Sequence, residues 1–335
     1  MDSHQILIQQ VKTAVSARRA RNTRFKRLPL MGLGYLSLMT SGERINDHTA
    51  IPAKPDLIRL GLGIIGIGTS GPLIAMSAMP VLTLIFWRNL GGSLITVPFA
   101  LRHSRDRAGM KWAMIAGVLL ALHFIGFFLA MRMTTVAAGT ALVALQPIFA
   151  ALFVKFSGGH IPSKAWLGMI VSFVGVILVS GVDLTISFRS FMGDIAALIS
   201  AALAAAYMMA GSKAQRTLET STYTTVCYFV CSITALPMAL IAGNEIFAFE
   251  QKEWLILLGL ILGAQLLGHT MFNSALKRVS PAIVSLIVFF EVPVSAVLAV
   301  WWLDQTPPLG IIPGIALILI GCVLVVTRTR GASND

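Results

Sequence analysis

The chain has 335 residues, of which 56% are hydrophobic and only 12% charged, and its mean hydropathy is +0.81. Because soluble domains carry about a quarter charged residues, this composition excludes an ordinary soluble domain and predicts an integral membrane protein. The net charge of +12 is explained by membrane orientation and a basic tail, so we expect no nucleic-acid partner.

Residues 1–56 precede the first apolar stretch and are rich in arginine. Seven Lys and Arg residues lie at positions 12 to 27. Three interpretations are open: an arm on an anionic membrane surface, an organelle transit peptide, or a segment ahead of a true start at Met31 or Met39. Of these alternatives we favour a cytoplasmic tail without a role in transport.

Ten apolar stretches follow, each long enough to cross a hydrocarbon layer of roughly 30 Å as a helix of about 20 residues. The predicted spans are Leu57–Ala78, Pro80–Leu101, Trp112–Met131, Thr135–Lys155, Lys164–Gly181, Gly193–Ala210, Thr222–Ala242, Trp254–Ala275, Pro281–Trp302 and Leu309–Thr327. No long polar insertion leaves room for a soluble domain. We therefore expect an all-α integral membrane fold that ends in a short cytoplasmic tail, residues 328–335.

The second half of the chain repeats a frame of residue types from the first half, 146 positions later. The matching pairs are Gly117 and Gly263, His123 and His269, Arg132 and Arg278, Pro147 and Pro293, Pro162 and Pro308, Gly168 and Gly314, and Gly175 and Gly321. Glycine and proline fix where helices bend or approach closely, so this shared frame indicates duplication. We expect two five-helix repeats, residues 57–181 and 191–327. Since five is odd, the second repeat is inverted relative to the first.

Loop charges predict the orientation, because cytoplasmic loops carry an excess of Lys and Arg. One set of loops and ends holds mostly basic residues: Arg102, Arg105, Arg107, Lys111, Lys155, Lys164, Lys213, Arg216, Lys277, Arg278, Arg328 and Arg330. The opposite loops mix both signs: Arg132, Arg189, Lys252, Asp183, Glu245, Glu250, Glu253 and Asp304. We expect both termini in the cytoplasm and a plasma membrane location, which in a bacterium is the inner membrane.

These patterns together resemble the drug/metabolite transporter superfamily, EamA type, over roughly residues 57–327. The residues that carry the resemblance are Arg132 and Pro147 with Arg278 and Pro293, Gly168 and Gly175 with Gly314 and Gly321, Gly193-Asp194, and Ala275-Leu276-Lys277-Arg278-Val279-Ser280. The family's acid directly before the ninth-helix proline is displaced here, to Glu291. The resemblance implies a ten-helix transporter, on a scaffold that serves amino acids, nucleotide derivatives, vitamins, sugars and drugs.

Duplicated membrane halves are typical of secondary transporters, whose solute site lies between the repeats. We predict a secondary active transporter that exports or takes up a small organic metabolite, such as an amino acid or a related compound, by alternating access. The alternatives are a membrane-embedded enzyme that uses Glu291 with His269, or a receptor with the same polar cavity. An enzyme gives no reason for an inverted duplication, so we expect no enzyme.

The expected partners are a small-molecule solute, the lipid bilayer and, as candidate coupling ion, protons. We expect a monomer or a homodimer. No phosphate loop or hydrolase motif is present, and no cofactor is predicted. The thiols Cys227, Cys231 and Cys322 lack nearby His or acidic partners in the sequence, so we expect no metal site either.

Polar residues at membrane depth are expensive and mark a solute path or a structural pairing. Gln265, His269 and Asn273 follow an i, i+4, i+8 spacing that places them on one face of helix 8. The alternative is that they only bond neighbouring helices. His123, the repeat partner of His269, either packs helices together or forms the other wall of the cavity. Tyr207 joins the candidate solute site.

Glu291 is, by these spans, the only acid well inside the membrane. An unpaired carboxylate there costs about 2.5–3.5 kcal/mol, so we expect it to face the bundle interior. It either carries a proton or binds a cationic group of the solute. The alternative is a static charge pair with Arg88 of helix 2.

Helix breaks at mid-depth point to a site between the repeats. Pro72, Pro147 and Pro293 interrupt helices 1, 4 and 9, and each proline frees a backbone carbonyl. We therefore add Ser70 and Gln146, which lie beside these breaks, to the candidate solute site.

Overall fold

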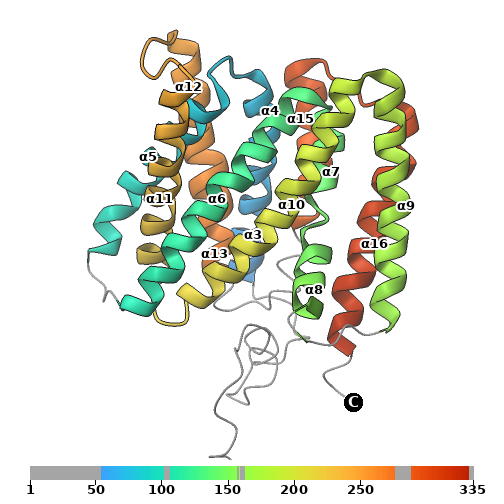
Figure 1. Cartoon of the computed structure of the whole chain (residues 1–335), viewed down its shortest axis with the longest axis horizontal. Coiled ribbons are helices and arrows are strands. Elements are labelled where there is room, and N and C mark those ends of the chain that lie inside the picture. Colours follow the sequence, from blue (N-terminus) through green and yellow to red (C-terminus); the bar gives the residue numbers. More distant parts are fainter. Residues whose placement is uncertain (1–53, 102–105, 157, 159–162, 276–287, 332–335) are drawn as a thin grey trace, which may run out of the picture.

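The computed structural model describes residues 54–101, 106–156, 158, 163–275 and 288–331, and every regular element in these ranges is a helix (Figure 1). In this part of the chain eight helical segments are long and apolar enough to cross a membrane, and two further apolar helices are shorter. The described part of the chain therefore has the all-helical, apolar structure of an integral membrane protein. The basic tail up to residue 53 and the predicted cytoplasmic residues Lys277 and Arg278 lie outside the described residues.

The first half of the described chain forms seven helices. They are α3 (Lys54–Gly68), α4 (Ser70–Met76), α5 (Val81–Ala100), α6 (Arg107–Met133), α7 (Val136–Val143), α8 (Gln146–Phe156) and α9 (Ser163–Ile186). The first predicted span is thus divided into α3 and α4, and the fourth into α7 and α8.

The second half begins with two long helices and ends with shorter pieces. They are α10 (Phe188–Ala214), α11 (Thr220–Ile241), α12 (Gln251–Gly259), η1 (Leu260–Thr270), α13 (Met271–Ala275), α15 (Glu291–Leu303), η2 (Leu309–Ile311) and α16 (Ile312–Gly331). The predicted helix 8 therefore contains a π-helical stretch, η1, between two α-helical segments.

Several helix starts follow from local side-chain chemistry. Asp106, Thr135 and Ser187 each accept a hydrogen bond from the backbone N–H three residues later. Such N-caps satisfy backbone donors that the first helical turn leaves free. At the other end of a helix, Asp304 terminates α15 in the left-handed region (φ 51°), which short polar side chains tolerate best among non-glycine residues.

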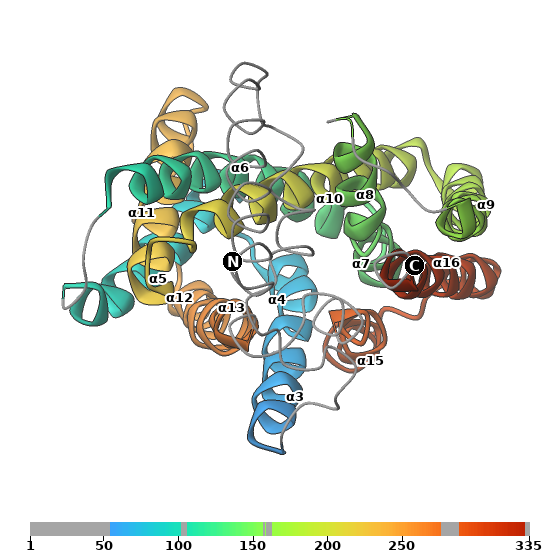
Figure 2. The ribbon, with the colours of Figure 1, turned by 90° about the horizontal axis from the view of Figure 1, so that it is seen from below.

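Helices α9 and α16 lie side by side at one edge of the molecule in both views (Figures 1 and 2). A Cβ on Gly175 would stand 2.6 Å from the Gly314 carbonyl oxygen, and one on Gly321 would stand 2.4 Å from the Gly168 carbonyl oxygen. Only glycine permits backbones to approach so closely. Because residue numbers rise along α9 as they fall along α16 in these contacts, the two helices run antiparallel.

Two hydrogen bonds join positions that are 146 residues apart, the interval of the sequence repeat. Ser172 Oγ donates to the Ile318 carbonyl oxygen at 3.1 Å between α9 and α16, and Ser232 Oγ donates to the Phe86 carbonyl oxygen at 3.1 Å between α11 and α5. Equivalent positions meet in this way where two copies of a unit pack around a two-fold axis. The two halves therefore contact each other through corresponding surfaces.

The interior of the bundle lies between two groups of helices. Seen from below, α6 and α10 cross along one side, and α3, α4, α13 and α15 lie opposite them (Figure 2). Outward-facing side chains are apolar, as Leu94, Phe173 and Trp301 illustrate with 62%, 63% and 76% exposure. Lipid rather than water is the solvent that such a surface requires.

Several predicted spans stopped short of the helix ends, and one of these boundaries has a consequence for the charges inside the membrane. Helix α9 continues to Ile186, beyond the expected end at Gly181, so Asp183 is helical and buried at 1% exposure. Asp194 lies in the second turn of α10 and is buried at 0%. Glu291 is therefore not the only acid inside a span, because apolar windows end at a charge even where the helix does not.

Candidate functional site

A fully buried guanidinium is the centre of the candidate site. Arg88 of α5 has 0% exposure; its Nε donates to Gln265 Oε1 at 2.7 Å and its Nη1 to Ser70 Oγ at 3.4 Å. The amide of Gln265 in turn donates to Asn89 Oδ1 at 3.0 Å. This polar network joins α4, α5 and η1 at the point where α3 gives way to α4.

Two aromatic rings cover the Arg88 guanidinium. Its Cζ lies 4.5 Å from the ring centroid of Phe124 and 5.6 Å from that of Phe128, an arrangement that stabilises a cation. The remaining nitrogen, Nη2, is buried and has no hydrogen-bond partner in the described part of the chain. A buried charged donor without an acceptor is costly, so this nitrogen is chemically suited to an acceptor on a bound solute.

Glu291 is the first residue of α15 and is partly buried. Its carboxyl group lies near the Arg88 guanidinium, but no ion pair within 4.0 Å joins the two side chains. The candidate site thus holds a buried guanidinium and, near it, a carboxyl group that is not ion-paired with it.

The three predicted residues of helix 8 meet three different neighbouring helices. Gln265 contacts α5, as described above. His269 lies edge-on to Phe124 of α6 with 6.1 Å between ring centroids, and Asn273 hydrogen-bonds with the Tyr207 hydroxyl of α10. All three side chains therefore point toward neighbouring helices of the bundle.

His123 is bonded to α10. Its Nδ1 lies 2.8 Å from Ser200 Oγ, and that hydroxyl also lies 3.0 Å from the His123 carbonyl oxygen. The ring stacks on Phe127 with centroids 5.9 Å apart. These contacts hold α6 against α10, which is the packing role weighed above against a role in the cavity.

The three prolines lie at or near interruptions of the helices. α3 gives way to α4 two residues before Pro72, and α7 gives way to α8 directly before Pro147. Pro293 is the third residue of α15. Gln146 begins α8, and its amide contacts Met208 Sδ of α10.

Sequence reasoning missed a second polar cluster, formed by Asp183 of α9 and Asp194 of α10. Thr134 Oγ1 donates to Asp183 Oδ2 at 2.7 Å. The two carboxyl groups contact each other, and the hydroxyls of Thr134 and Ser180 are neighbours of Asp194. The dipeptide Gly193-Asp194 carried part of the family resemblance, and this was the available signal for the cluster.

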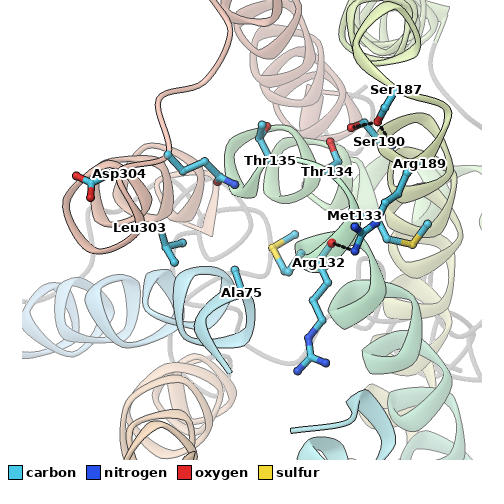
Figure 3. A pocket seen from close by; sticks show the side chains of 12 residues that line it. Ala75, Arg132, Met133, Thr134, Thr135, Ser187, Arg189, Ser190, Leu303 and Asp304 are labelled. Atoms are coloured by element: carbon cyan, nitrogen blue, oxygen red, sulfur yellow. Dashed lines mark hydrogen bonds between the residues drawn. The ribbon is translucent and has the colours of Figure 1, made fainter. Parts of the chain in front are cut away.

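Thr134 also lines an open hollow of about 820 Å³ at the end of the bundle where α6 ends and α10 begins (Figure 3). Arg132 and Arg189 lie on its wall, and Arg189 Nη2 donates to the Arg132 carbonyl oxygen at 3.0 Å. Arg132 Nη2 donates to the Met79 carbonyl oxygen at 2.6 Å. In the described residues no group of three His, Cys, Asp or Glu side chains could hold a metal ion.

Relatives of this chain are transporters. The pseudopaline exporter CntI of Pseudomonas aeruginosa is 24% identical over 262 residues, which cover 77% of this chain and 90% of that protein. An uncharacterized transporter of Archaeoglobus fulgidus is 26% identical over 245 residues, covering 70% and 83%. A solved crystal structure shares the fold, with a TM-score of 0.58 and 17% identity over 83% of this chain and 99% of that chain.

A sequence model of the EamA-like transporter family matches residues 57–181 and again residues 191–327. The two matches together cover more than half of the chain and include part of every helix in the described bundle. The chain belongs to the EamA-like transporter family.

Proposed function

We propose that the protein is a secondary active transporter that moves a small organic metabolite, such as an amino acid or a related compound, by alternating access. The observation that carries the proposal is the buried Arg88 with its unpartnered Nη2 and the nearby carboxyl group of Glu291. Charges at membrane depth are expensive and mark the paths of solutes and ions. Because one relative is named as an exporter, we take export as the direction to test first.

The proposed architecture is ten membrane helices in two inverted five-helix repeats, residues 57–181 and 191–327, with tails 1–56 and 328–335. The hydrogen bonds between positions 146 apart and the antiparallel α9 and α16 support this architecture. The two shorter apolar helices supply the ninth and tenth spans. We further propose cytoplasmic termini, a plasma membrane location and a monomer or homodimer.

The solute path in this proposal runs along the faces that surround Arg88. The residues proposed to line it are Ser70, His123, Gln146, Tyr207, Gln265, His269, Asn273 and Glu291. Glu291 binds a cationic group of the solute or carries the coupling proton. Pro72, Pro147 and Pro293 supply the breaks at which the helices bend between the two states.

A metabolite panel is the first experiment. A compound that binds the native protein raises its thermal stability, by about 2.7 kcal/mol at a concentration 100 times the Kd. Each compound that stabilises the purified protein is then tested for flux in reconstituted vesicles. A compound that binds without flux would favour the receptor, and chemical conversion of a bound compound would favour the enzyme.

Substitution of Glu291 then separates its two roles. If Glu291 carries the coupling proton, Glu291→Gln loses gradient-driven accumulation but retains solute exchange, because an amide cannot change charge. If it binds a cationic group, Glu291→Gln weakens binding itself. Glu250→Gln, which changes an exposed loop acid in the same way, is the matched control. A Glu291→Gln protein that binds and accumulates solute like the parent assigns Glu291 to packing or to a static pair with Arg88.

A further inference from the structure

The acids Asp183 and Asp194 are buried more completely than Glu291. Their exposed fractions are 1% and 0%, and their carboxyl groups contact each other between α9 and α10. Among the carboxylate oxygens only Asp183 Oδ2 has a donor, the Thr134 hydroxyl. Asp183 Oδ1 and both oxygens of Asp194 have no partner in the described part of the chain.

The Ser180 side chain is the third polar group beside the two carboxyl groups. Ser180 is one turn before Asp183 on α9, is 8% exposed, and its hydroxyl lies beside the Asp194 carboxyl without forming a hydrogen bond of regular geometry to any described residue. Gly193 packs against the backbone of Thr134, so a Cβ there would stand 2.8 Å from the Thr134 nitrogen. The backbones of α10 and of the residues after α6 are therefore in close contact beside the cluster.

Among the described residues no Lys or Arg side chain forms an ion pair with either acid. Arg132, at the end of α6, directs its Nη2 to the Met79 carbonyl oxygen, and Arg189, on α10, directs its Nη2 to a backbone carbonyl. In Figure 3 the Arg132 side chain extends away from Thr134, and Asp304, which directly follows α15, lies across the hollow. Two carboxylates in contact without a counter-charge repel each other strongly in a low dielectric.

We infer that Asp183 and Asp194 hold one proton between them, and that this pair is a proton-binding site which opens through Thr134 onto the hollow between α6 and α10. A single proton makes one carboxyl a donor to the other, so it removes the repulsion and supplies a partner to an orphan oxygen at once. The proton exchanges with water in the hollow by way of the Thr134 hydroxyl. Its use as a coupling ion rests on the proposed transport function, but its presence does not.

Infrared spectroscopy of the purified full-length protein tests the inference without any solute. A protonated carboxyl group gives a carbonyl-stretch band that an ionised one lacks. We expect Asp183→Asn, Asp194→Asn and the double variant to lose the same single band with the same area, because an asparagine amide donates to the remaining carboxylate. Ser180→Ala and Glu291→Gln should keep this band. Loss of two bands in the double variant, or of none, would overturn the shared proton.

Melting temperatures measured across a range of pH distinguish loss of the shared proton from a general folding defect in the variants. Removal of the proton at alkaline pH leaves two negative charges in contact, so the melting temperature of the parent should fall with rising pH more steeply than that of Asp194→Asn. Parallel curves would contradict the inference. If the band behaves as expected but no flux is found with any compound, the proton site stands and the proposed transport function fails.

Discussion

Arg88 illustrates how a single residue determines the chemistry of its surroundings. Its guanidinium uses Nε and Nη1 for Gln265 and Ser70 and lies over two phenylalanine rings. A planar guanidinium with several N–H donors can bond two acceptors and stack on aromatic rings at the same time, whereas the compact ammonium group of a lysine cannot. The sequence indicated that an arginine lies in helix 2, but it could not indicate that Gln265, 177 positions later, is its acceptor.

Removal of that acceptor should be costly. Gln265→Leu leaves Arg88 Nε and Asn89 Oδ1 without their partners, and each buried unsatisfied group costs about 1–3 kcal/mol, with the charged one at or above the upper end. The exposed Gln251→Leu is the matched control and should change stability by less than about 0.5 kcal/mol. Thermal unfolding of both purified variants checks this, and equal stabilities would exclude the network as a stabilising element.

Asp106 gives a pH-dependent prediction outside the membrane spans. The backbone N–H of Gly109 and then the Thr217 hydroxyl donate to its carboxylate, and they hold the pKa of Asp106 below its usual 3.8. The ionised form is the one that these bonds favour, so its contribution to stability is complete above the unfolded pKa and is lost as the pH falls through the lower folded pKa.

Asp106→Asn keeps an N-cap acceptor but removes the charge. We expect the variant to be less stable than the parent at neutral pH, with a difference that shrinks to zero in acid below the folded pKa. Melting temperatures of both proteins across the acidic range measure it. A stability difference that does not depend on pH would mean that the charge of Asp106 contributes nothing to the stability of this helix start.

At the scale of the helices, apolar windows predicted the spans well and their irregularities poorly. The ends of α5 and α11 lie within two residues of the prediction, because a long apolar run flanked by polar residues leaves little choice in lipid. The π-helical η1 was not predicted, since an apolar run looks the same with either helical period. Thr270 Oγ1 donates to the Gln265 carbonyl oxygen at 3.2 Å inside this wider turn. Asp183 was missed because the predicted apolar span ended at Gly181, ahead of this charged residue, although the helix itself continues to Ile186.

The glycines between α9 and α16 give an element-scale prediction. In Gly321→Ala the new Cβ would stand 2.4 Å from the Gly168 carbonyl oxygen and 2.2 Å from Ser172 Oγ. Backbone cannot move aside at low cost, so we expect a destabilisation of about 1–3 kcal/mol or more. Gly181→Ala on α9 meets nothing within 4 Å and should instead stabilise by about 0.5–1 kcal/mol. Thermal unfolding compares the two, and equal effects would contradict the close packing.

At the scale of the whole molecule, the sequence predicted the duplication that the two family matches reflect, and its loop charges predict an orientation that labelling can test. Alanines 108 and 248 are both exposed, one at the start of α6 and the other in the connection after α11, at opposite ends of the bundle. The natural cysteines of the described residues, Cys227, Cys231 and Cys322, are buried. A single new cysteine at either alanine therefore reports its own side of the membrane.

We expect Ala248→Cys to react with an impermeant thiol reagent added to intact cells, and Ala108→Cys to react only after the membrane is opened. The reason is that the excess of basic loops, which remains in the cytoplasm, lies at the Ala108 end. Unaltered parent protein is the background control. The reverse labelling pattern would place both termini outside the cell.

The two hydrogen bonds between positions 146 apart have a consequence for how the two sides of the membrane differ. In a pair of separate, identical halves, positions 86 and 232 would hold the same residue, and so would positions 172 and 318. With serine at both equivalent positions, each serine would donate to the carbonyl oxygen of the other, so the bond would form twice. With another residue at both positions, it would not form at all. In the joined chain the serine stands on one side only, opposite Phe86 or Ile318. Fusion of the halves thus frees each contact from self-complementarity, so the two ends of the bundle can differ in sequence and in structure.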